Sequence, residues 1–155
     1  MGRLPEPRLR PFCTLMVEVG PSKPFGQGRF GQRRMVPILG GTVSGPYFAG
    51  KVLGDGADWQ TVNPEGLTEL SAHYAFETDD GAIIEIVNSG LRHALPDILV
   101  RLSGENDVPP GSSYMRTTAL LQTGHPGYQW LNGLLFVGTG AKVGDTVQID
   151  LYAVE

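Results

Sequence analysis

The chain has 155 residues, a net charge of −4 and 18% charged side chains, which is the composition of one compact domain and argues against disorder. The negative charge argues against nucleic acid as the main partner, and a lone cysteine, Cys13, excludes an internal disulfide. No apolar stretch approaches the roughly 18 residues that a membrane span needs. We therefore expect no membrane partner and a soluble, cytoplasmic protein.

The first part of the chain predicts a tail followed by a strand and a loop. Residues 1–11 carry prolines among arginines and are expected to form an extended N-terminal tail, which leaves residues 12–155 as a single domain. Residues 12–19 alternate apolar and polar side chains, which predicts a strand. Residues 20–31 are rich in glycine and proline and predict a loop. This loop has glycines at dinucleotide-binding spacing, but no helix start follows them, which argues against a nucleotide site.

The middle of the chain predicts two hairpins. Residues 33–39 are a strand candidate, and residues 42–44 with 47–53 indicate a hairpin. The clearest hairpin joins residues 70–78 to residues 82–88 through an Asp-Gly step, which supplies the positive φ of a tight turn. Its apolar face holds Tyr74, Phe76, Thr78, Ala82, Ile84, Ile86 and Asn88. Glu77 is on the opposite face and is expected to point away from this packing.

The last third of the chain adds further strands. Residues 97–102 have the leucine spacing of a helical turn, so we predict at most one short helix, near residues 97–103. Residues 114–122, 134–137 and 146–154 are strand candidates, and residues 126–132 are a turn or a short helix. Many short strands between turns predict an all-β fold, either a barrel or a sandwich. We prefer a single antiparallel β-barrel, because closure removes exposed edges and a small barrel can hold one ligand in its mouth.

Residues 45–60 hold the strongest candidate for a functional site. A short run of alternating apolar and polar residues ends at glycines. It is followed by a carboxylate, an indole and a carboxamide: Asp58, Trp59 and Gln60. Two interpretations fit equally well. Asp58 could cap a turn while Trp59 fills the end of the barrel. Alternatively, Asp58 lies beside an apolar wall that raises its pKa toward neutrality and suits it to proton transfer.

Polar groups further along the chain could complete a site around Asp58. Arg116 within a strand needs a carboxylate partner if it is buried, and Glu77 and Asp58 are the candidates. An inward-facing arginine could equally bind the carboxylate of a ligand. Trp130 and Asn132 lie in a second apolar segment. The three histidines lack metal-binding spacing and the acidic residues lack the order of a calcium loop, so we expect no metal and no cofactor.

Several short motifs carry a family resemblance. They are Gly-x-Gly-Ala-Asp-Trp-Gln at 54–60, Glu-Thr-Asp-Asp-Gly-Ala-Ile-Ile at 77–84, Asn88-x-Gly90, Tyr114-x-Arg116-Thr117, and Tyr128-x-Trp130-Leu131-Asn132 with Phe136-Val137-Gly138. In this order, over about residues 12–155, the chain resembles the domain of unknown function 3237 family of bacterial proteins. The resemblance implies a single antiparallel β-barrel that forms a homo-oligomer, a dimer or larger, with no established general activity. The family motif often begins with two adjacent glycines, whereas Asp55 separates Gly54 from Gly56 in this chain.

Three functions from different classes follow from these features. The leading hypothesis is a cofactor-independent acid–base enzyme of the lyase or isomerase type with a small-molecule pocket. In this hypothesis Asp58 or Glu77 is the base and Arg116 holds an anionic group. The expected ligand-binding residues are Trp59, Gln60, Tyr74, Trp130 and Asn132. The alternatives are a barrel that binds a small ligand without chemistry and a structural or oligomerisation module with its tryptophans at a subunit interface. Both pocket hypotheses require Asp58, Arg116 and Asn132 to converge on one cavity.

Overall fold

A computed structural model of the protein describes residues 2–94 and 113–155, and within these ranges it contains ten strands and one short 3-10 helix. The strands are β1 (Leu9–Val19), β2 (Lys23–Gln27), β3 (Gln32–Ser44), β4 (Ala49–Val52), β5 (Gly56–Val62), β6 (Thr68–Thr78), β7 (Ile83–Ala94), β8 (Ser113–Gln122), β9 (Phe136–Val143) and β10 (Thr146–Val154). The 3-10 helix η1 spans Gln129–Gly133. The helix predicted near residues 97–103 lies outside the described residues. In the described ranges no helix is both long enough and apolar enough to cross a membrane.

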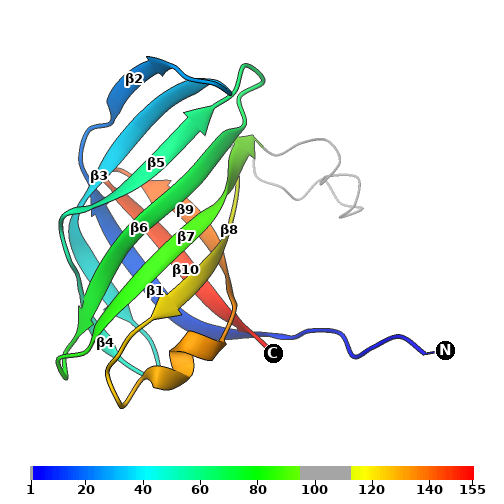
Figure 1. Ribbon diagram of the computed structural model, residues 1–155, viewed down its shortest axis with the longest axis vertical. Coiled ribbons are helices and arrows are strands. Elements are labelled where there is room, and N and C mark those ends of the chain that lie inside the picture. The colour runs from blue at the N-terminus through cyan, green and yellow to red at the C-terminus, as the bar shows by residue number, and fades with distance from the viewer. Residues whose placement is uncertain (1, 95–112) are drawn as a thin grey trace.

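The strands close into an antiparallel barrel with eight positions around its circumference (Figure 1). Strand β1 pairs with β10 on one side and with β3 on the other, which closes the sheet. Strands β4 and β5 share the position between β3 and β6, because β5 pairs with the first half of β3 and β4 with the second half. Strand β2 continues the position of β1 along the first half of β3. This architecture confirms the prediction of an all-β, antiparallel barrel.

The side chains alternate between the interior and the surface of the barrel along each strand. The hairpin of β6 and β7 follows the predicted faces. Tyr74, Phe76, Ile84 and Ile86 are buried in the core, whereas Glu77 between them is exposed. The core is built in the same way from inward residues of the other strands, so the interior is filled by side chains except near one end.

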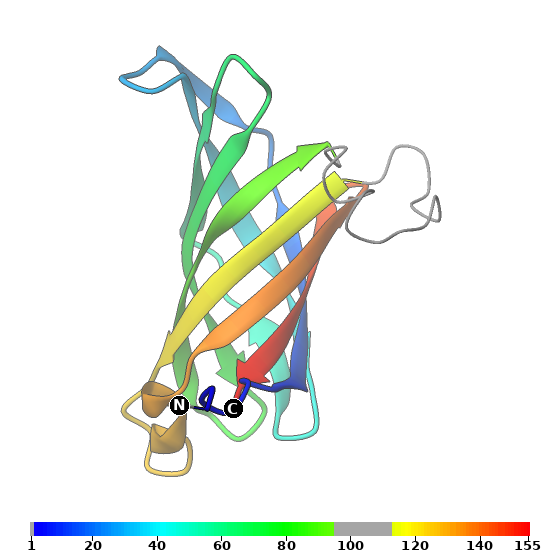
Figure 2. The same cartoon turned by 90° about the vertical axis from the view of Figure 1, so that its right-hand side faces the viewer.

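One end of the barrel is closed by aromatic side chains, here called the aromatic plug. The plug consists of Phe12, Tyr47, Phe48, Phe76, Tyr128, Trp130 and Phe136, whose rings form a network of contacts centred on Phe12 and Phe48. Figure 2 shows that η1 and the C-terminus lie at this end, whereas β2 lies at the opposite end. The buried Leu131 of η1 packs into the same core. Any access to the interior is therefore expected from the end that carries β2.

The structure differs from the sequence-based prediction in three strands. Residues 56–62 form β5, so Asp58 lies within a strand and not in a turn after one. Residues 23–27, predicted as loop, form β2, whose side chains are all exposed. Strand β1 begins at Leu9, inside the segment expected to be a tail. The turn before β5 contains Asp55 with φ of 72°, the left-handed region in which glycine is favoured. This backbone conformation explains why a family motif with glycines suits that turn.

Candidate functional site

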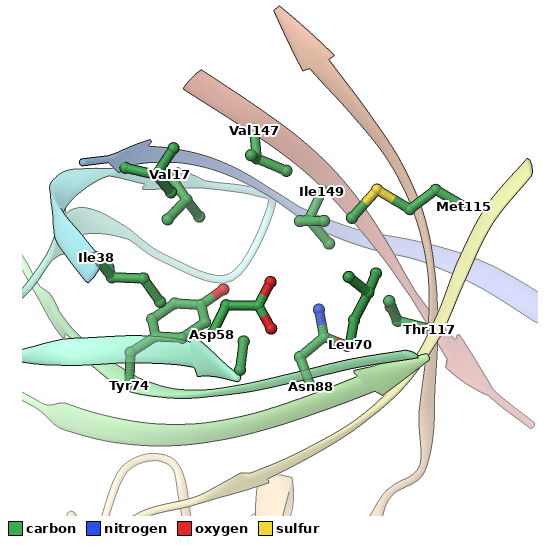
Figure 3. A pocket seen from close by; sticks show the side chains of 12 residues that line it. Val17, Ile38, Asp58, Leu70, Tyr74, Asn88, Met115, Thr117, Val147 and Ile149 are labelled. Atoms are coloured by element: carbon green, nitrogen blue, oxygen red, sulfur yellow. The ribbon is translucent and has the colours of Figure 1, made fainter. Parts of the chain in front are cut away.

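The barrel encloses a cavity of about 50 Å³, here called the inner chamber (Figure 3). Its walls are mostly aliphatic and come from seven strands. The lining residues are Val17, Val19, Ile38, Asp58, Leu70, Ala72, Tyr74, Asn88, Met115, Thr117, Val147 and Ile149. By the volume that one water molecule needs, the chamber has room for about three or four water-sized groups. A ligand can therefore place only a small part of itself inside.

A larger cleft of about 560 Å³ lies against the chamber and is here called the mouth. The two share Val19, Asp58, Met115 and Val147 as lining residues, so they adjoin along these four side chains, of which Asp58 is the charged one. The other residues that line the mouth are Gly20, Pro21, Ser22, Arg34, Val36, Leu39, Gln60, Arg92, Lys142 and Asp145. The chamber and the mouth together reach the size of a small-molecule site.

A directional chain of hydrogen bonds holds the Asp58 carboxyl group. Gln60 Nε2 donates to Asp58 Oδ2 at 2.7 Å, and the backbone N–H of Ser71 donates to Oδ1 at 3.0 Å. Arg34 Nε in turn donates to Gln60 Oε1 at 2.7 Å. Because a guanidinium can only donate, Arg34 fixes the carboxamide so that Gln60 presents its N–H groups to Asp58. Both carboxyl oxygens of Asp58 therefore accept a hydrogen bond from a fixed direction.

The pKa of Asp58 is raised above the ordinary value of an aspartate, and burial is the largest cause. The hydrogen bonds from Gln60 and Ser71 and the charges of Arg92 and Arg34 lower the pKa but do not cancel the effect of burial. Asp58 thus keeps its proton to a higher pH than an exposed aspartate. A carboxyl group with a pKa nearer neutrality can both donate and accept a proton, as general acid–base catalysis requires.

Three more polar side chains face the chamber, and two of them carry unsatisfied oxygens. Figure 3 shows the Tyr74 hydroxyl and the Asn88 amide directed into the space that the Asp58 carboxyl also faces. Asn88 Oδ1 and Thr117 Oγ1 are buried and have no hydrogen-bond partner among the described residues. Burial raises the pKa of Tyr74 above the ordinary value of a tyrosine, so its phenol stays neutral and can donate a hydrogen bond. Buried polar atoms without a partner are rare and fit a site that binds a polar group.

The structure brings three of the predicted site residues to this cavity. Asp58 and Tyr74 line the inner chamber, and Gln60 lines the mouth. Trp59 points outward, because it alternates with Asp58 and Gln60 along β5. Its ring is 40% exposed, stacks on Phe25 with 5.5 Å between centroids and lies 5.4 Å from the guanidinium of Arg33. The indole therefore packs on the outer surface beside β2.

The structure does not bring Glu77 or Arg116 to the cavity. Glu77 is exposed on the outer face of β6, since its neighbours Phe76 and Thr78 occupy the inner face. Arg116 is exposed on the outer face of β8 for the same reason, with its guanidinium 5.1 Å from the ring of Tyr114. Neither side chain reaches the interior without reversing the register of its strand.

Trp130 and Asn132 belong to the opposite end of the barrel. Trp130 is 43% exposed and contacts Phe12 in the aromatic plug. Asn132 Oδ1 accepts a hydrogen bond from the backbone N–H of Thr123 at 2.8 Å, and its Nδ2 donates to the carbonyl of Thr123 at 2.9 Å. Asn132 thus ties η1 to the end of β8. The convergence of Asp58, Arg116 and Asn132 that was expected from the sequence does not occur, so both pocket hypotheses fail in the form in which the sequence suggested them. The polar partners of Asp58 in the chamber are instead Tyr74, Asn88 and Thr117.

Four functional candidates were not identified as such from the sequence: Asn88, Thr117, Arg34 and Arg92. Asn88 was placed on the apolar face of a hairpin, and a carboxamide on such a face is itself a signal. Thr117 shows the same signal, because it shares its face of β8 with the buried Met115. The two arginines gave no comparable signal, since arginines at strand ends are common on surfaces.

The unsatisfied hydroxyl of Thr117 makes a prediction for stability. Thr117→Val keeps the shape and removes a buried oxygen that has no partner, so we expect the free energy of unfolding to rise by about 1 kcal/mol. The matched control is Thr78→Val on β6. Thr78 Oγ1 accepts a hydrogen bond from the backbone N–H of Ala82 at 2.9 Å, and its loss should lower the free energy of unfolding by about 1–3 kcal/mol. Urea denaturation measures both, and equal destabilisation by the two variants would contradict the prediction.

The fold and the cavity define a class of protein: a small closed β-barrel with an aromatic plug at one end and a carboxyl group between a chamber and a mouth at the other. The chain belongs to the family described as protein of unknown function (DUF3237), which matches residues 7–154. This finding confirms the resemblance carried by the sequence motifs. A UPF0311 protein of Rhodopseudomonas palustris (strain TIE-1) is 44% identical over 141 residues, which cover 91% of this chain and 92% of the relative.

Three further comparisons concern the fold and a named activity. A β-barrel-like protein from Acinetobacter baumannii AYE has a crystal structure with a TM-score of 0.89 and 35% identity, and each chain is covered to 100%. A hydroalkoxylation enzyme of Penicillium herquei is 25% identical over 149 residues, 96% of this chain and 85% of that protein. The crystal structure of an enzyme from the same fungus gives a TM-score of 0.75 at 24% identity with 100% of both chains covered, a likeness in fold.

Proposed function

We propose that the protein is an enzyme that adds the O–H bond of a hydroxyl group across a carbon–carbon double bond of a small, largely apolar substrate, or catalyses the reverse elimination. Asp58 is the proton-transfer group. The observation that carries the proposal is the position of this carboxyl group, whose pKa is raised, on the wall of a chamber that is otherwise mostly aliphatic. Proton transfer by a carboxyl group in such surroundings is a recurring basis of acid–base catalysis.

The residues of the chamber suit each step of such an addition to a double bond conjugated with a carbonyl. Asp58 takes the proton of the substrate hydroxyl while the oxygen forms a bond to the β-carbon. The electron pair of the double bond moves to the carbonyl oxygen, where the Tyr74 hydroxyl and the Asn88 amide donate hydrogen bonds to the developing charge. Asp58 then returns the proton to the α-carbon, while the electron pair moves back from the oxygen and restores the carbonyl. All atoms of the substrate are kept and no electrons are gained or lost, so the reaction calls for no redox cofactor.

The name of one relative supports this class of reaction. The protein from Penicillium herquei is described as a hydroalkoxylation enzyme, and hydroalkoxylation is the addition of an O–H bond across a double bond. An addition within one molecule is an isomerisation. The reverse of an addition between two molecules is an elimination, which is a lyase reaction. Both belong to the classes that the sequence suggested. The aliphatic walls favour a substrate that is apolar around the reacting carbons.

The proposal is tested with short chains that carry a hydroxyl group and a conjugated enone. Uncatalysed cyclisation of such a probe gives a racemic cyclic ether. We expect the protein to give an excess of one enantiomer and, in D₂O, to place deuterium at the α-carbon. Tyr74→Phe should lower the rate by about 10²- to 10³-fold, the usual loss when a donor to a developing oxyanion is removed. Chiral chromatography and mass spectrometry measure these results.

Two other outcomes would reject the enzyme. If a probe raises the melting temperature but is recovered unchanged, the protein is a ligand-binding barrel, which was the alternative suggested by the sequence. If no probe binds or reacts, the chamber is not a site for hydroxy-enones. Phe30→Ala serves as a control for the preparation, because Phe30 is 76% exposed and its removal should leave both binding and turnover unchanged.

A further inference from the structure

We infer that the substrate is an amphipathic anion, with a carboxylate or phosphate group bound in the mouth by Arg34, Arg92 and Lys142 and an apolar part that enters the inner chamber. The inference rests on the proposed function, since it names the substrate class of the same site. It does not depend on which reaction Asp58 performs.

The first observation is the excess of positive charge in the mouth. Three cationic side chains line it, from three different strands: Arg34 on β3, Arg92 on β7 and Lys142 on β9. The acidic residues that line the same cleft are Asp145 and Asp58. The mouth is therefore positive although the whole chain carries a net charge of −4.

The second observation is that, among the described residues, these cations make no direct ion pair, although the charges of Arg34 and Arg92 do act on Asp58. Within residues 2–94 and 113–155 the ion pairs are Arg10 with Glu155 and His73 with Glu85, and neither lies in the mouth. Arg34 donates its Nε–H to Gln60, which leaves its other guanidinium N–H groups to donate to a ligand. Arg92 is half-buried beside Arg34, and both its burial and that neighbouring charge lower its pKa. An anion between the two guanidiniums would relieve their repulsion.

The third observation is how the mouth and the chamber are arranged. The charged groups line the outer cleft, whereas beyond Asp58 the walls are formed by aliphatic side chains such as Leu70 and Ile149 (Figure 3). A ligand that spans both must be charged at one end and apolar at the other. The chamber of about 50 Å³ accepts only the end of such a chain. A free inorganic anion would satisfy the mouth but leave the chamber unused.

The test uses molecules that cannot react, so that binding is separated from catalysis. Titration calorimetry would compare octanoate, octyl phosphate and octanol on the full chain. We expect the anion that matches the mouth to bind at least about tenfold more tightly than octanol, a difference of about 1.4 kcal/mol. The stronger of the two anions then identifies the head group. High salt should weaken the binding of the anion and leave the binding of octanol unchanged.

A matched pair of variants locates the binding. Lys142→Gln in the mouth and Lys51→Gln on the exposed outer face of β4 remove the same charge from the chain. We expect Arg92→Gln and Lys142→Gln each to weaken anion binding about tenfold or more, and Lys51→Gln to have no effect. Equal binding of octanol and the anions, equal losses in the two lysine variants, or no binding of either anion would each overturn the inference. Turnover of a neutral hydroxy-enone would still support the proposed function in that case.

Discussion

Asp58→Asn is expected to lower kcat for the addition reaction by about 10²- to 10⁴-fold, the usual contribution of a general acid–base group. The asparagine keeps the size of the side chain but can neither take nor return a proton. Its Oδ1 can still accept the hydrogen bond from the backbone N–H of Ser71, whereas its Nδ2 meets the N–H of Gln60 and cannot accept it. We therefore expect some loss of stability in a barrel that remains folded. Steady-state kinetics on the hydroxy-enone probe measures the loss, with circular dichroism as the check on folding.

The matched control for this variant is Asp145→Asn. Asp145 also lines the mouth but is not a residue of the inner chamber, so we expect its replacement to change kcat by only a small factor. A similar loss in both variants would mean that the reaction depends on the charge of the mouth and not on proton transfer at Asp58. A fully active Asp58→Asn variant would remove Asp58 from the mechanism altogether.

The raised pKa of Asp58 also predicts the pH dependence of folding relative to Asp58→Asn. The unfolded chain releases this proton near the ordinary aspartate value of 3.8, while the folded chain still holds it. In that window the folded state binds more protons, so stability must fall as pH rises. The wild type should therefore lose stability relative to the variant as pH rises from about the ordinary value through the raised one. Urea titrations at several pH values would show a constant difference if the pKa of Asp58 were unshifted.

The strands that could be predicted are those whose pattern is dictated by one buried face. Strand β10 has the bounds expected from its alternation, and the β6–β7 hairpin has the expected faces because an Asp-Gly turn sets its register. Strand β2 could not be predicted, since all its side chains are exposed and no buried face leaves a pattern. Strand β5 begins at Gly56, directly after glycines that resembled the end of a strand.

The candidate site was predictable in part for the same reason. Asp58 and Gln60 stand out in the sequence as polar residues beside an indole, and they do reach the cavity. Arg116 stood out equally, but the face of a strand on which a residue lies depends on register, and a shift of one residue reverses it. Whether a residue lies near the mouth or near the plug depends on topology. The prediction for Asn132 was wrong for this reason, because η1 lies at the plugged end of the barrel, opposite the end that carries β2 (Figure 2).

A β-bulge explains why one important core residue was not recognised. Simple alternation from Cys13 and Leu15 would place Phe12 on the outer face of β1. The pairing of β1 with β10 shifts register between Pro11 and Cys13, so two successive side chains, Phe12 and Cys13, turn inward and are 2% and 6% exposed. Burial raises the pKa of the Cys13 thiol to about 12, which makes it a buried apolar side chain and not a nucleophile.

Phe12→Ala is expected to lower the free energy of unfolding by about 3–5 kcal/mol, the range for removing a buried phenylalanine. Its ring is the centre of the aromatic plug, with centroids of Tyr47, Phe48, Trp130 and Phe136 between 4.8 and 6.0 Å away. Alanine leaves a cavity that four rings from three separate segments cannot fill together. Such a loss is a large share of the roughly 5–15 kcal/mol that stabilises a domain.

Two comparisons serve as controls for the Phe12→Ala prediction. Phe30→Ala removes the same atoms from a side chain that is 76% exposed and should change the free energy of unfolding by no more than about 0.5 kcal/mol. The plug lies at the end opposite the mouth, so the Phe12→Ala protein should retain its kcat at temperatures where it is still folded. Equal stability of the two variants would mean that the plug does not hold the barrel closed. A loss of kcat in a folded Phe12→Ala protein would instead mean that the two ends of the barrel are coupled.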